Sequence, residues 1–384
     1  MARKKIERNI SYDDVREKYY VTLNYGISSE TQKQVKATKT AETLPEARKI
    51  LRHHETARDM GAVVMPKKLT VADWLKEWME TVIKPNRAET TVYGYQNMLD
   101  NHIEPALGAI PLQKLTASQL QRYYAEKMQE EGLSSNTVRK HHDLLKSALK
   151  VAVMQDLIVK NPAEKVTPPK VEESEISFYT AEQLRELLRL VAGHRLEVLV
   201  KLAGYLGLRR EEIMGLKWAN IDFEKSVIRI TVARTSAGSK VIEKTTKNVS
   251  STRRLHMPED LSAVLKEQKR VQDERKAYLG EGYCDGGYVF AHEDGRPFRP
   301  NYASILFTKF VEENQLPKIT LHGLRHTFAT TANALGIPMF DIGKALGHST
   351  PAITGKIYTH LLDPSHQSTV DKIANELKET TETG

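Results

Sequence analysis

The chain has 384 residues, of which 40% are hydrophobic and 28% are charged, so it is long enough to bury two or three domain cores. It has no run of about 18 apolar residues, and its basic N-terminus lacks an apolar stretch, which excludes a membrane span and a secretory signal. The net charge of +8 favours a polyanionic partner, nucleic acid before an anionic membrane, and the single cysteine, Cys284, excludes an internal disulfide and fits a cytoplasmic protein.

The first predicted domain covers residues 1–64. Residues 18–26 and 31–40 are rich in β-branched and aromatic residues, which predicts two strands joined by a turn near residues 26–29. A T-x-x-E capping box then predicts a helix over residues 43–58. The second predicted strand contains Lys33, Lys36 and Lys39. These lysines could contact DNA, or they could be ordinary solvated residues at the edge of a sheet.

The second predicted domain, residues 65–166, is helical. Apolar residues at helical spacing predict four helices, over residues 70–83, 91–103, 120–132 and 134–158. Capping residues precede two of them, at Thr70 with Asp73 and at Thr116 with Gln119.

The last of these helices contains a basic turn that we expect to be exposed. It fits a phosphate-contacting face, although a solvated helix face is the commoner meaning of such a run. Its residues are Arg139, Lys140, His141 and His142.

A proline-containing segment without helical or strand period follows, and we place an interdomain linker at residues 167–177. The third domain, residues 178–384, is predicted to begin with a helix capped by Thr180 and Gln183. Two further helices with a break at Gly207 follow, then strands at 226–235 and 253–258 separated by a lysine-rich loop, then helices to the C-terminus. The predicted fold class is therefore multidomain and mainly α with small β-sheets: a sheet plus helix, a helical domain, and a mixed α+β domain.

Five residues of the third domain form a pattern suited to phosphate chemistry. Arg209 lies just after a glycine at a helix start, a position that favours an anion. In "HGLRH", His322 and Arg325 are three residues apart and so share a helix face. His348 follows a glycine at an expected helix end, and Tyr358 lies ten residues further on.

Together, these residues can act on a phosphodiester. Arginine donates two hydrogen bonds to phosphate oxygens and stays charged, so it stabilises the charge that builds on a pentacoordinate phosphorus. A tyrosine hydroxyl is a candidate nucleophile, but its pKa near 10 requires a cationic site and a nearby base.

Each residue also has an ordinary explanation when it is taken alone. Arg209 could simply pair with Glu212, His322 could be a satisfied core histidine, and Tyr358 could be a core aromatic residue. His322 and His326 could form a metal pair of a chelator-sensitive hydrolase, although the zinc motif has glutamate where this chain has glycine.

Together, three segments resemble the signature boxes of the tyrosine recombinase (phage integrase) family, in the order of that family and near its spacing. They are "GYLGLRREEIMGLKW", "ITLHGLRHTFATTANALG" and "IGKALGHSTPAITGKIYTH". The resemblance implies that Arg209 and Arg325 clamp the scissile phosphate, that His322 and His348 complete the site, and that Tyr358 is the nucleophile.

The resemblance also implies a lysine in a β-hairpin that acts as general acid on the leaving 5′-oxygen. In "TTKNVSSTRRLHMP" the best match is Lys247, with Lys244 and Lys240 nearby as alternatives. Glu212 matches an acidic position that supports the site.

The implied protein is a metal-free and cofactor-free site-specific recombinase that joins double-stranded DNA through a 3′-phosphotyrosyl link and works as a homotetramer. Residues 1–64 weakly resemble an arm-type DNA-binding domain, which favours a phage or mobile-element integrase with an excisionase and a host DNA-bending protein as helpers. The alternatives are a Xer-like resolvase with the same chemistry and an inactive DNA-binding relative. Whether the tail after Tyr358 packs on its own protomer or on a neighbour stays open.

Overall fold

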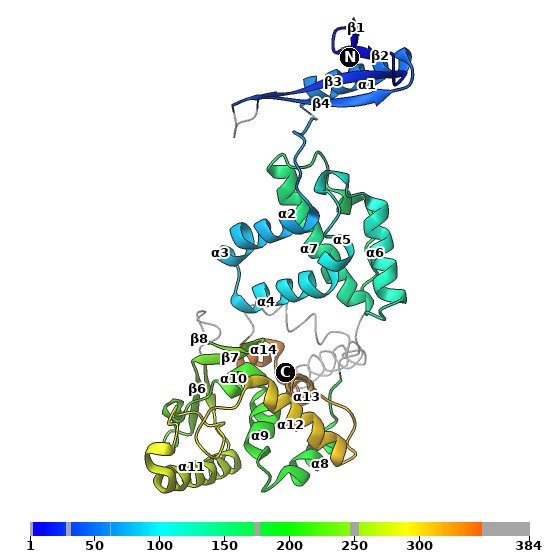
Figure 1. Cartoon of the computed structure of the whole chain (residues 1–384). Coiled ribbons are helices and arrows are strands. Elements are labelled where there is room, and N and C mark those ends of the chain that lie inside the picture. The colour runs from blue at the N-terminus through cyan, green and yellow to red at the C-terminus, as the bar shows by residue number, and fades with distance from the viewer. Residues whose placement is uncertain (1–2, 28–31, 62, 173–176, 246–252, 348–384) are drawn as a thin grey trace, which may run out of the picture. The chain divides into compact units, whose positions relative to one another are not determined.

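The computed structural model describes residues 3–27, 32–61, 63–172, 177–245 and 253–347. The chain divides into two compact units, Met1–Glu173 and Ser174–Gly384, which are described separately (Figure 1). Among the described residues, no helix has the length and apolar character needed to cross a membrane.

The N-terminal part is an antiparallel sheet of four strands in sequence order, followed by one helix. The elements are β1 Lys4–Glu7, β2 Ile10–Asp13, β3 Lys18–Ile27, β4 Gln34–Ala41 and α1 Leu44–Asp59. The sequence predicted β3, β4 and the helix but missed β1 and β2. These are four-residue strands in which charged and polar residues dominate, and they are joined by a tight turn with Asn9 at φ 66°, so their local signal is weak.

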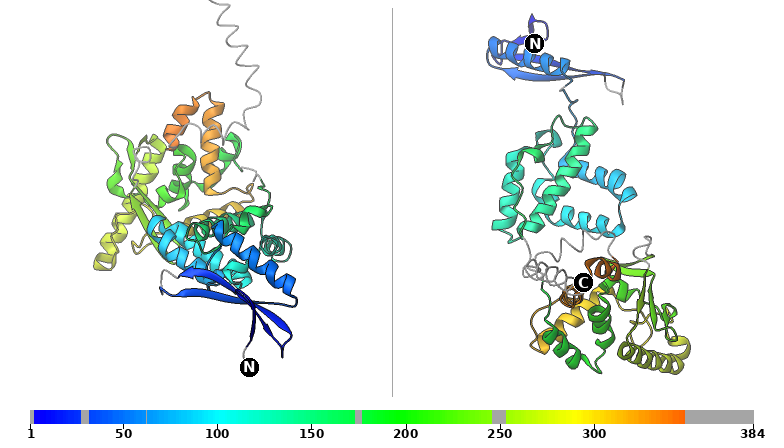
Figure 2. Two further views of the ribbon diagram at one scale, coloured as in Figure 1. Left: turned by 90° about the horizontal axis from the view of Figure 1, so that it is seen from above. Right: turned by 180° about the vertical axis from the view of Figure 1, so that it is seen from behind.

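One face of this sheet packs on α1, as Figure 2 shows. Val21 and Leu23 alternate on β3 and are buried together with Ala47 of the helix. Thr43 caps the helix and accepts the backbone N–H of Glu46 at 3.4 Å, as the capping pattern predicted. The three lysines of the second predicted strand are exposed, which leaves both of their interpretations open.

The rest of the first unit is helical. Its main helices are α2 Val71–Trp78, α4 Glu89–Met98, α6 Ala117–Gln129 and α7 Ser135–Met154. Both parts of the predicted capping interaction are present at Thr70 and at Thr116. Short 3₁₀ turns lie at Leu112–Lys114 and Pro162–Lys165.

Two of these helices continue through a π-helical turn. The turns are Met79–Ile83, which leads into α3 Lys84–Asn86, and Leu99–Ile103, which leads into α5 Glu104–Leu107. In each short helix the second residue is proline, which has no N–H to donate. The preceding N–H bonds five residues back, from Lys84 to Met79 and from Glu104 to Leu99, which widens the helix locally.

The basic turn on α7 is not fully exposed, so that expectation was wrong for its histidines. His141 and His142 are buried, and their Nδ1 atoms lie 2.9 and 3.1 Å from the hydroxyl groups of Tyr123 and Tyr124. Two neighbouring residues on a helix can both be buried here because the tyrosines of α6 supply polar partners. Only Lys140 of the four is exposed, while Arg139 is half-buried.

The second unit begins with α8 Ala181–Val191 and α9 Glu197–Leu206, then α10 Arg210–Met214. The predicted capping box at Thr180 is present, and α9 ends at Gly207 as predicted. The later helices are α11 Glu259–Leu279, α12 Pro300–Glu313, α13 Leu321–Ala334 and α14 Met339–Leu346, with 3₁₀ turns at Trp218–Asn220 and Gly280–Gly282. The apolar side of α9 is buried against α13 and α11, and this contact forms the core that carries the site.

The strands of this unit form two small sheets. One has the order β5 Ile221–Asp222, β6 Val227–Ile230 and β9 Arg253–His256, and the other is a hairpin of β7 Val232–Ala237 and β8 Lys240–Thr245. The sequence predicted one strand over 226–235 and a loop after it. The structure divides that run between two sheets. Four of the six residues of β8 are charged or polar, so its strand propensity is low and the sequence did not predict it.

Candidate active site

The site is built where α9 ends and α10 begins. Gly207 terminates α9 in the left-handed conformation, at φ 59°. A Cβ at this position would lie 2.6 Å from Leu346 Cδ2 and 2.8 Å from Phe328 Cδ1, so α13 and the end of α14 pack directly on the glycine. Only glycine combines this backbone with this close approach.

Two residues later, Arg209 is the N-cap of α10, where the sequence placed it. Its backbone N–H donates to Glu212 Oε2 at 2.8 Å, and its Nη1 donates to Glu212 Oε1 at 3.0 Å. Its Nη2 also lies 3.5 Å from the carbonyl oxygen of Gly347, just after α14. The Arg209 side chain keeps 34% of its surface exposed, so the guanidinium remains accessible to an anion.

Glu212 is almost fully buried between two arginines. Arg253, on β9, donates from Nη1 and Nη2 to the two carboxylate oxygens at 2.9 Å each, and from Nε to the carbonyl of Ala345 at 2.8 Å. Burial acts to raise the pKa of Glu212, but the bonds from Arg253 and Arg209 outweigh it and hold that pKa below its ordinary value. Glu212 is therefore an anion that fixes two cations.

Arg253 is a residue that the sequence reasoning missed. It belongs to "RRLHMP", for which the sequence predicted a strand and part of the lysine-bearing hairpin but no role for this arginine. Two adjacent arginines at the start of a short strand place one side chain on each face of the sheet, so one of them must point inward and find a carboxylate. That pattern was the available signal.

Arg325 lies on α13 and is 2% exposed. Its Nη1 donates to the carbonyl of Gly207 at 2.6 Å and its Nη2 donates to the carbonyl of Leu346 at 2.7 Å, so it joins the C-terminal ends of α9 and α14. Carbonyl groups at helix ends lack helical partners and favour a cation. The guanidinium has five N–H donors, and these two bonds fix its plane.

His322 and His326 lie one turn apart on α13, and their rings meet edge to face with centroids 4.6 Å apart. Removal of water, and then the charge of Arg325, lowers the pKa of His322, while burial lowers the pKa of His326 to about 4. Both rings are thus neutral at pH 7. Within the described ranges no third histidine, cysteine or carboxylate joins them to complete a metal-ligand set.

Three predicted site residues, Lys247, His348 and Tyr358, lie outside the described residues. The structure brings Arg209, Glu212 and Arg325 together where α9, α10 and α14 meet, and His322 lies on α13 with Arg325. His348 directly follows Gly347, which ends α14 in the left-handed conformation as the sequence predicted for a helix end. Such a cluster of fixed cations can bind and polarise a phosphate group.

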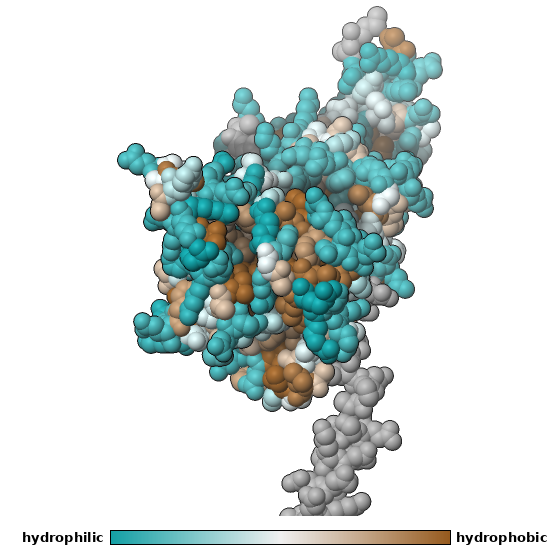
Figure 3. Space-filling model, turned by 90° about the horizontal axis from the view of Figure 1, so that it is seen from below, coloured by the Kyte–Doolittle hydropathy of each residue, from teal (hydrophilic) through white to brown (hydrophobic). Residues whose placement is uncertain are grey.

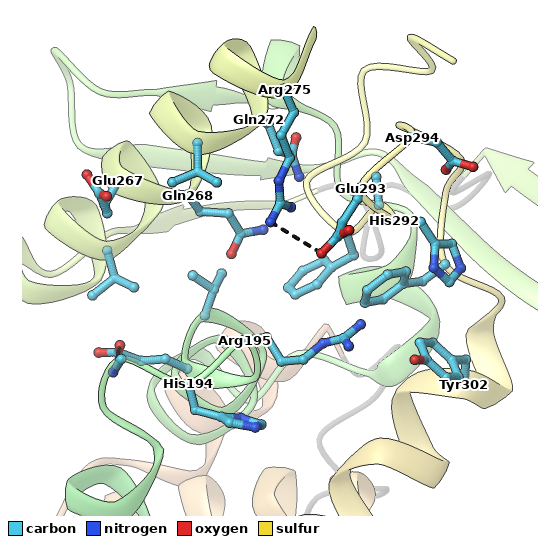
Figure 4. Close-up of a pocket in the computed structure, with 18 residues that line it drawn as sticks. His194, Arg195, Glu267, Gln268, Gln272, Arg275, His292, Glu293, Asp294 and Tyr302 are labelled. Atoms are coloured by element: carbon cyan, nitrogen blue, oxygen red, sulfur yellow. Dashed lines mark hydrogen bonds and ion pairs between the residues drawn. The ribbon is translucent and has the colours of Figure 1, made fainter. Parts of the chain in front are cut away.

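A cavity of about 810 Å³ lies at the other end of α9. Figure 4 shows Arg195 beneath it, with Arg275 reaching Glu293 across from it at 3.6 Å. Arg195 precedes α9 and Arg209 follows it, and this ten-residue helix spans about 15 Å. The cavity is therefore separate from the cluster of Arg209, Glu212 and Arg325. The face viewed in Figure 3 is mainly hydrophilic, with apolar surface between the charged side chains.

Two family models match the chain. The model described as the phage integrase family matches residues 177–364, and the phage integrase N-terminal SAM-like domain matches residues 70–128. Among curated proteins, the chain is 30% identical over 377 residues to a tyrosine recombinase XerC-like protein of Caldanaerobacter subterraneus subsp. tengcongensis, covering 93% of this chain and 96% of the relative. It is 25% identical to the ICEBs1 integrase of Bacillus subtilis, covering 92% and 96% of the two chains.

Solved structures show the same fold. The Tn1549 transposon integrase in complex with a circular intermediate DNA superposes with a TM-score of 0.67 at 23% identity, covering 79% of this chain and 99% of that one. A lambda integrase tetramer bound to a Holliday junction gives a TM-score of 0.56 at 18% identity, covering 92% and 96%.

Proposed function

The chain belongs to the phage integrase family of tyrosine recombinases, and we propose that it cleaves and rejoins DNA at specific sites to integrate and excise a mobile element. The observation that carries this proposal is the convergence of Arg209 and Arg325 at one point, each fixed by the bonds described above. A phosphate needs donors that are held in place before it arrives, because fixed dipoles and charges cost no reorganisation in the transition state.

In the proposed reaction, the Tyr358 hydroxyl oxygen attacks the scissile phosphorus, and the bond from phosphorus to the 5′-oxygen breaks. The products are a 3′-phosphotyrosyl link and a free 5′-hydroxyl. Arg209 and Arg325 stabilise the charge on the non-bridging oxygens. A histidine, His322 or His348, accepts the tyrosine proton, and Lys247 gives a proton to the leaving oxygen.

The covalent link conserves the bond energy, so a 5′-hydroxyl from a partner strand can attack it and exchange the strands without a nucleotide cofactor. The proposed partners are double-stranded core-type sites and three further copies of the chain. The structures of the DNA-bound Tn1549 integrase and of the lambda integrase tetramer on a Holliday junction support both. An excisionase and a host DNA-bending protein are proposed as helpers.

We assign residues 1–64 to arm-type DNA, residues 65–166 to core DNA, residues 167–177 to the linker and residues 178–384 to catalysis. The division into two compact units between Glu173 and Ser174 supports the linker. Three exposed lysines in and next to β4, Lys33, Lys36 and Lys39, support a DNA-binding role for the N-terminal part. The similarity to the ICEBs1 integrase over 92% of this chain supports a mobile-element integrase.

A nicked attachment-site duplex tests the chemistry, because cleavage next to a nick traps the covalent product. The protein is incubated with this DNA in EDTA and analysed on a denaturing gel. A shifted protein–DNA band is expected for wild type and not for Tyr358→Phe. Absence of the band for wild type, or an equal band for the variant, would contradict the proposal.

A Xer-like resolvase is the second candidate, since the chain is similar over 93% of its length to the tyrosine recombinase XerC-like protein of Caldanaerobacter. Deletion of residues 1–64 separates the two. An integrase should lose recombination of substrates that carry arm-type sites while it still cleaves core sites, whereas a resolvase should recombine its core sites unaided.

A further inference from the structure

The β7–β8 hairpin is fixed at its base to the helix that starts at Arg209. A Cβ on Gly215, at the end of α10, would lie 2.6 Å from the carbonyl oxygen of Val232, so the two backbones are in direct contact. Arg234 of β7 is buried and donates to the carbonyls of Met214 and Phe298 at 3.3 and 3.2 Å. The position of β7 is therefore tied to α10.

The second strand has a separate anchor. Glu243 pairs in register with Arg234, and its carboxylate accepts hydrogen bonds from Lys217 Nζ at 2.9 Å and from the Tyr288 hydroxyl. The Tyr288 ring covers the Arg234 guanidinium, with 4.4 Å between Cζ and the ring centroid. Glu243 thus connects β8 to two other segments of the unit.

The segments that hold Glu243 are themselves paired. The backbone N–H of Trp218 donates to Gly287 at 2.9 Å, and the N–H of Val289 donates to Leu216 at 3.0 Å, on either side of Lys217 and Tyr288. The backbone segments that carry the two donors are therefore held together.

The hairpin does not need Glu243 in order to form. Its tip is held by Arg299, whose Nη2 donates to the carbonyls of Gly238 and Ser239 at 3.2 and 2.6 Å. Six register pairs connect the strands, and the Glu243 side chain is 38% exposed. Hairpin stability therefore does not explain why the partly exposed Glu243 carboxylate has two donors near the end of β8. A role in setting the direction of the end of β8 explains it better.

The last residue of β8 is Thr245, and Lys247 follows two residues later. Two residues span at most about 7 Å, so the place of Thr245 limits the reach of the lysine. A general acid must come within about 3 Å of the oxygen that it protonates, and an error of about 1 Å in placement can cost about 100-fold in rate.

We infer that Glu243, held by Tyr288 and Lys217, is a positioning residue that directs the end of β8 so that the hairpin lysine protonates the leaving 5′-oxygen. This inference rests on the proposed function, in which Lys247 is that acid. Glu243 acts through the lysine and does not touch the DNA.

Substrate chemistry provides the test. In a duplex whose scissile phosphate carries sulfur in place of the bridging 5′-oxygen, the leaving group is a thiolate. Thiols have a pKa near 8.5, so a thiolate leaves without a proton from a general acid. A defect confined to leaving-group protonation should disappear on this substrate.

Single-turnover cleavage is measured with oxygen and sulfur substrates for wild type, Tyr288→Phe, Glu243→Ala and Lys247→Ala. Tyr288→Phe keeps the ring over Arg234 and removes only the hydroxyl group, which bonds to Glu243. Glu224→Ala is the matched control, because Glu224 is an exposed glutamate of the same unit. Thermal unfolding followed by circular dichroism verifies that each variant is folded. If Glu243→Ala is not folded, Tyr288→Phe alone tests the inference.

We expect Tyr288→Phe and Glu243→Ala to cleave the oxygen substrate about 10- to 100-fold more slowly than wild type, and the sulfur substrate within about 2-fold of it. Glu224→Ala should match wild type on both. Equal slowing on both substrates, or no slowing on either, would overturn the inference. Wild type that cleaves neither would instead contradict the proposed function, and Lys247→Ala without sulfur rescue would contradict the assignment of the acid.

Discussion

Arg253 binds both carboxylate oxygens of Glu212 at 2.9 Å each, while Arg209 binds the same carboxylate from the other side. One buried anion therefore orients a strand arginine and a helix-capping arginine together. Removing one partner of a buried ion pair leaves an uncompensated charge, which is more costly than losing an exposed pair.

Glu212→Gln should therefore reduce the free energy of unfolding of the second unit by about 3 kcal/mol and slow DNA cleavage, because Arg209 loses its orientation. Urea denaturation and single-turnover cleavage measure the two effects. Glu267→Gln is the control, since Glu267 forms an exposed pair with Arg270 and should change neither quantity appreciably. Equal stability of Glu212→Gln and wild type would show that the Arg253 contact is not formed.

Gly207→Ala should destabilise the second unit by about 3 kcal/mol. About 1 to 2 kcal/mol comes from the left-handed backbone, and the rest comes from the collision with Leu346 and Phe328. Gly193→Ala separates the two contributions, because Gly193 belongs to the same unit and has φ +73° but no atom within 4 Å of an added Cβ. Denaturant unfolding should give the larger loss at Gly207, and equal losses would contradict the close packing described for this site.

Arg325→Lys should cleave DNA at least about 100-fold more slowly than wild type. A lysine cannot bond to two helix-end carbonyls and present further donors in a fixed plane. Arg189→Lys, at an exposed residue paired with Glu186, should cleave at the wild-type rate. Cleavage by Arg325→Lys at a rate near wild type would remove Arg325 from the proposed phosphate clamp.

The first unit should lose stability as the pH falls from about 6.5 towards 4. Burial lowers the pKa of His141 to about 4, with His102 and Lys127 adding to the effect, whereas the unfolded chain binds the proton near 6.5. Between about pH 6.5 and 4 the unfolded state therefore binds more protons than the folded state. The stabilisation from neutral His141 is fully present above about pH 6.5 and decreases by about 3 kcal/mol as the pH falls towards 4.

Urea denaturation at pH 7.5, 6 and 5 measures that slope. His141→Gln retains an acceptor for Tyr123 and does not titrate, so it should have a shallower slope than wild type. His53→Gln, at an exposed histidine, should keep the wild-type slope. An unchanged slope in His141→Gln would show that His141 is not held neutral.

The sequence was informative where local rules apply. Thr70, Thr116 and Thr180 begin helices through side-chain bonds that depend only on the next three residues, and Gly207 ends one because of its backbone. The short strands β1, β2 and β8 were missed because neighbouring strands, and not their own residues, stabilise them.

The partners of buried charges could not be predicted from spacing. Arg209 and Glu212 are three residues apart and were considered as a pair, but Arg253 reaches the same carboxylate from 41 positions away. Likewise, the burial of His141 depends on Tyr123, which belongs to another helix. Such contacts arise from tertiary packing, which one sequence does not encode in any local pattern.

The most direct test of the central claim is to identify the residue that carries the DNA. Covalent complexes trapped on a nicked duplex in EDTA are digested with trypsin and nuclease, and the nucleotide-bearing peptide is sequenced by mass spectrometry. The chain contains 15 tyrosines, so the assignment is discriminating. We predict a 3′-nucleotide on Tyr358 alone; a nucleotide on another residue, or a 5′-linkage, would contradict the account.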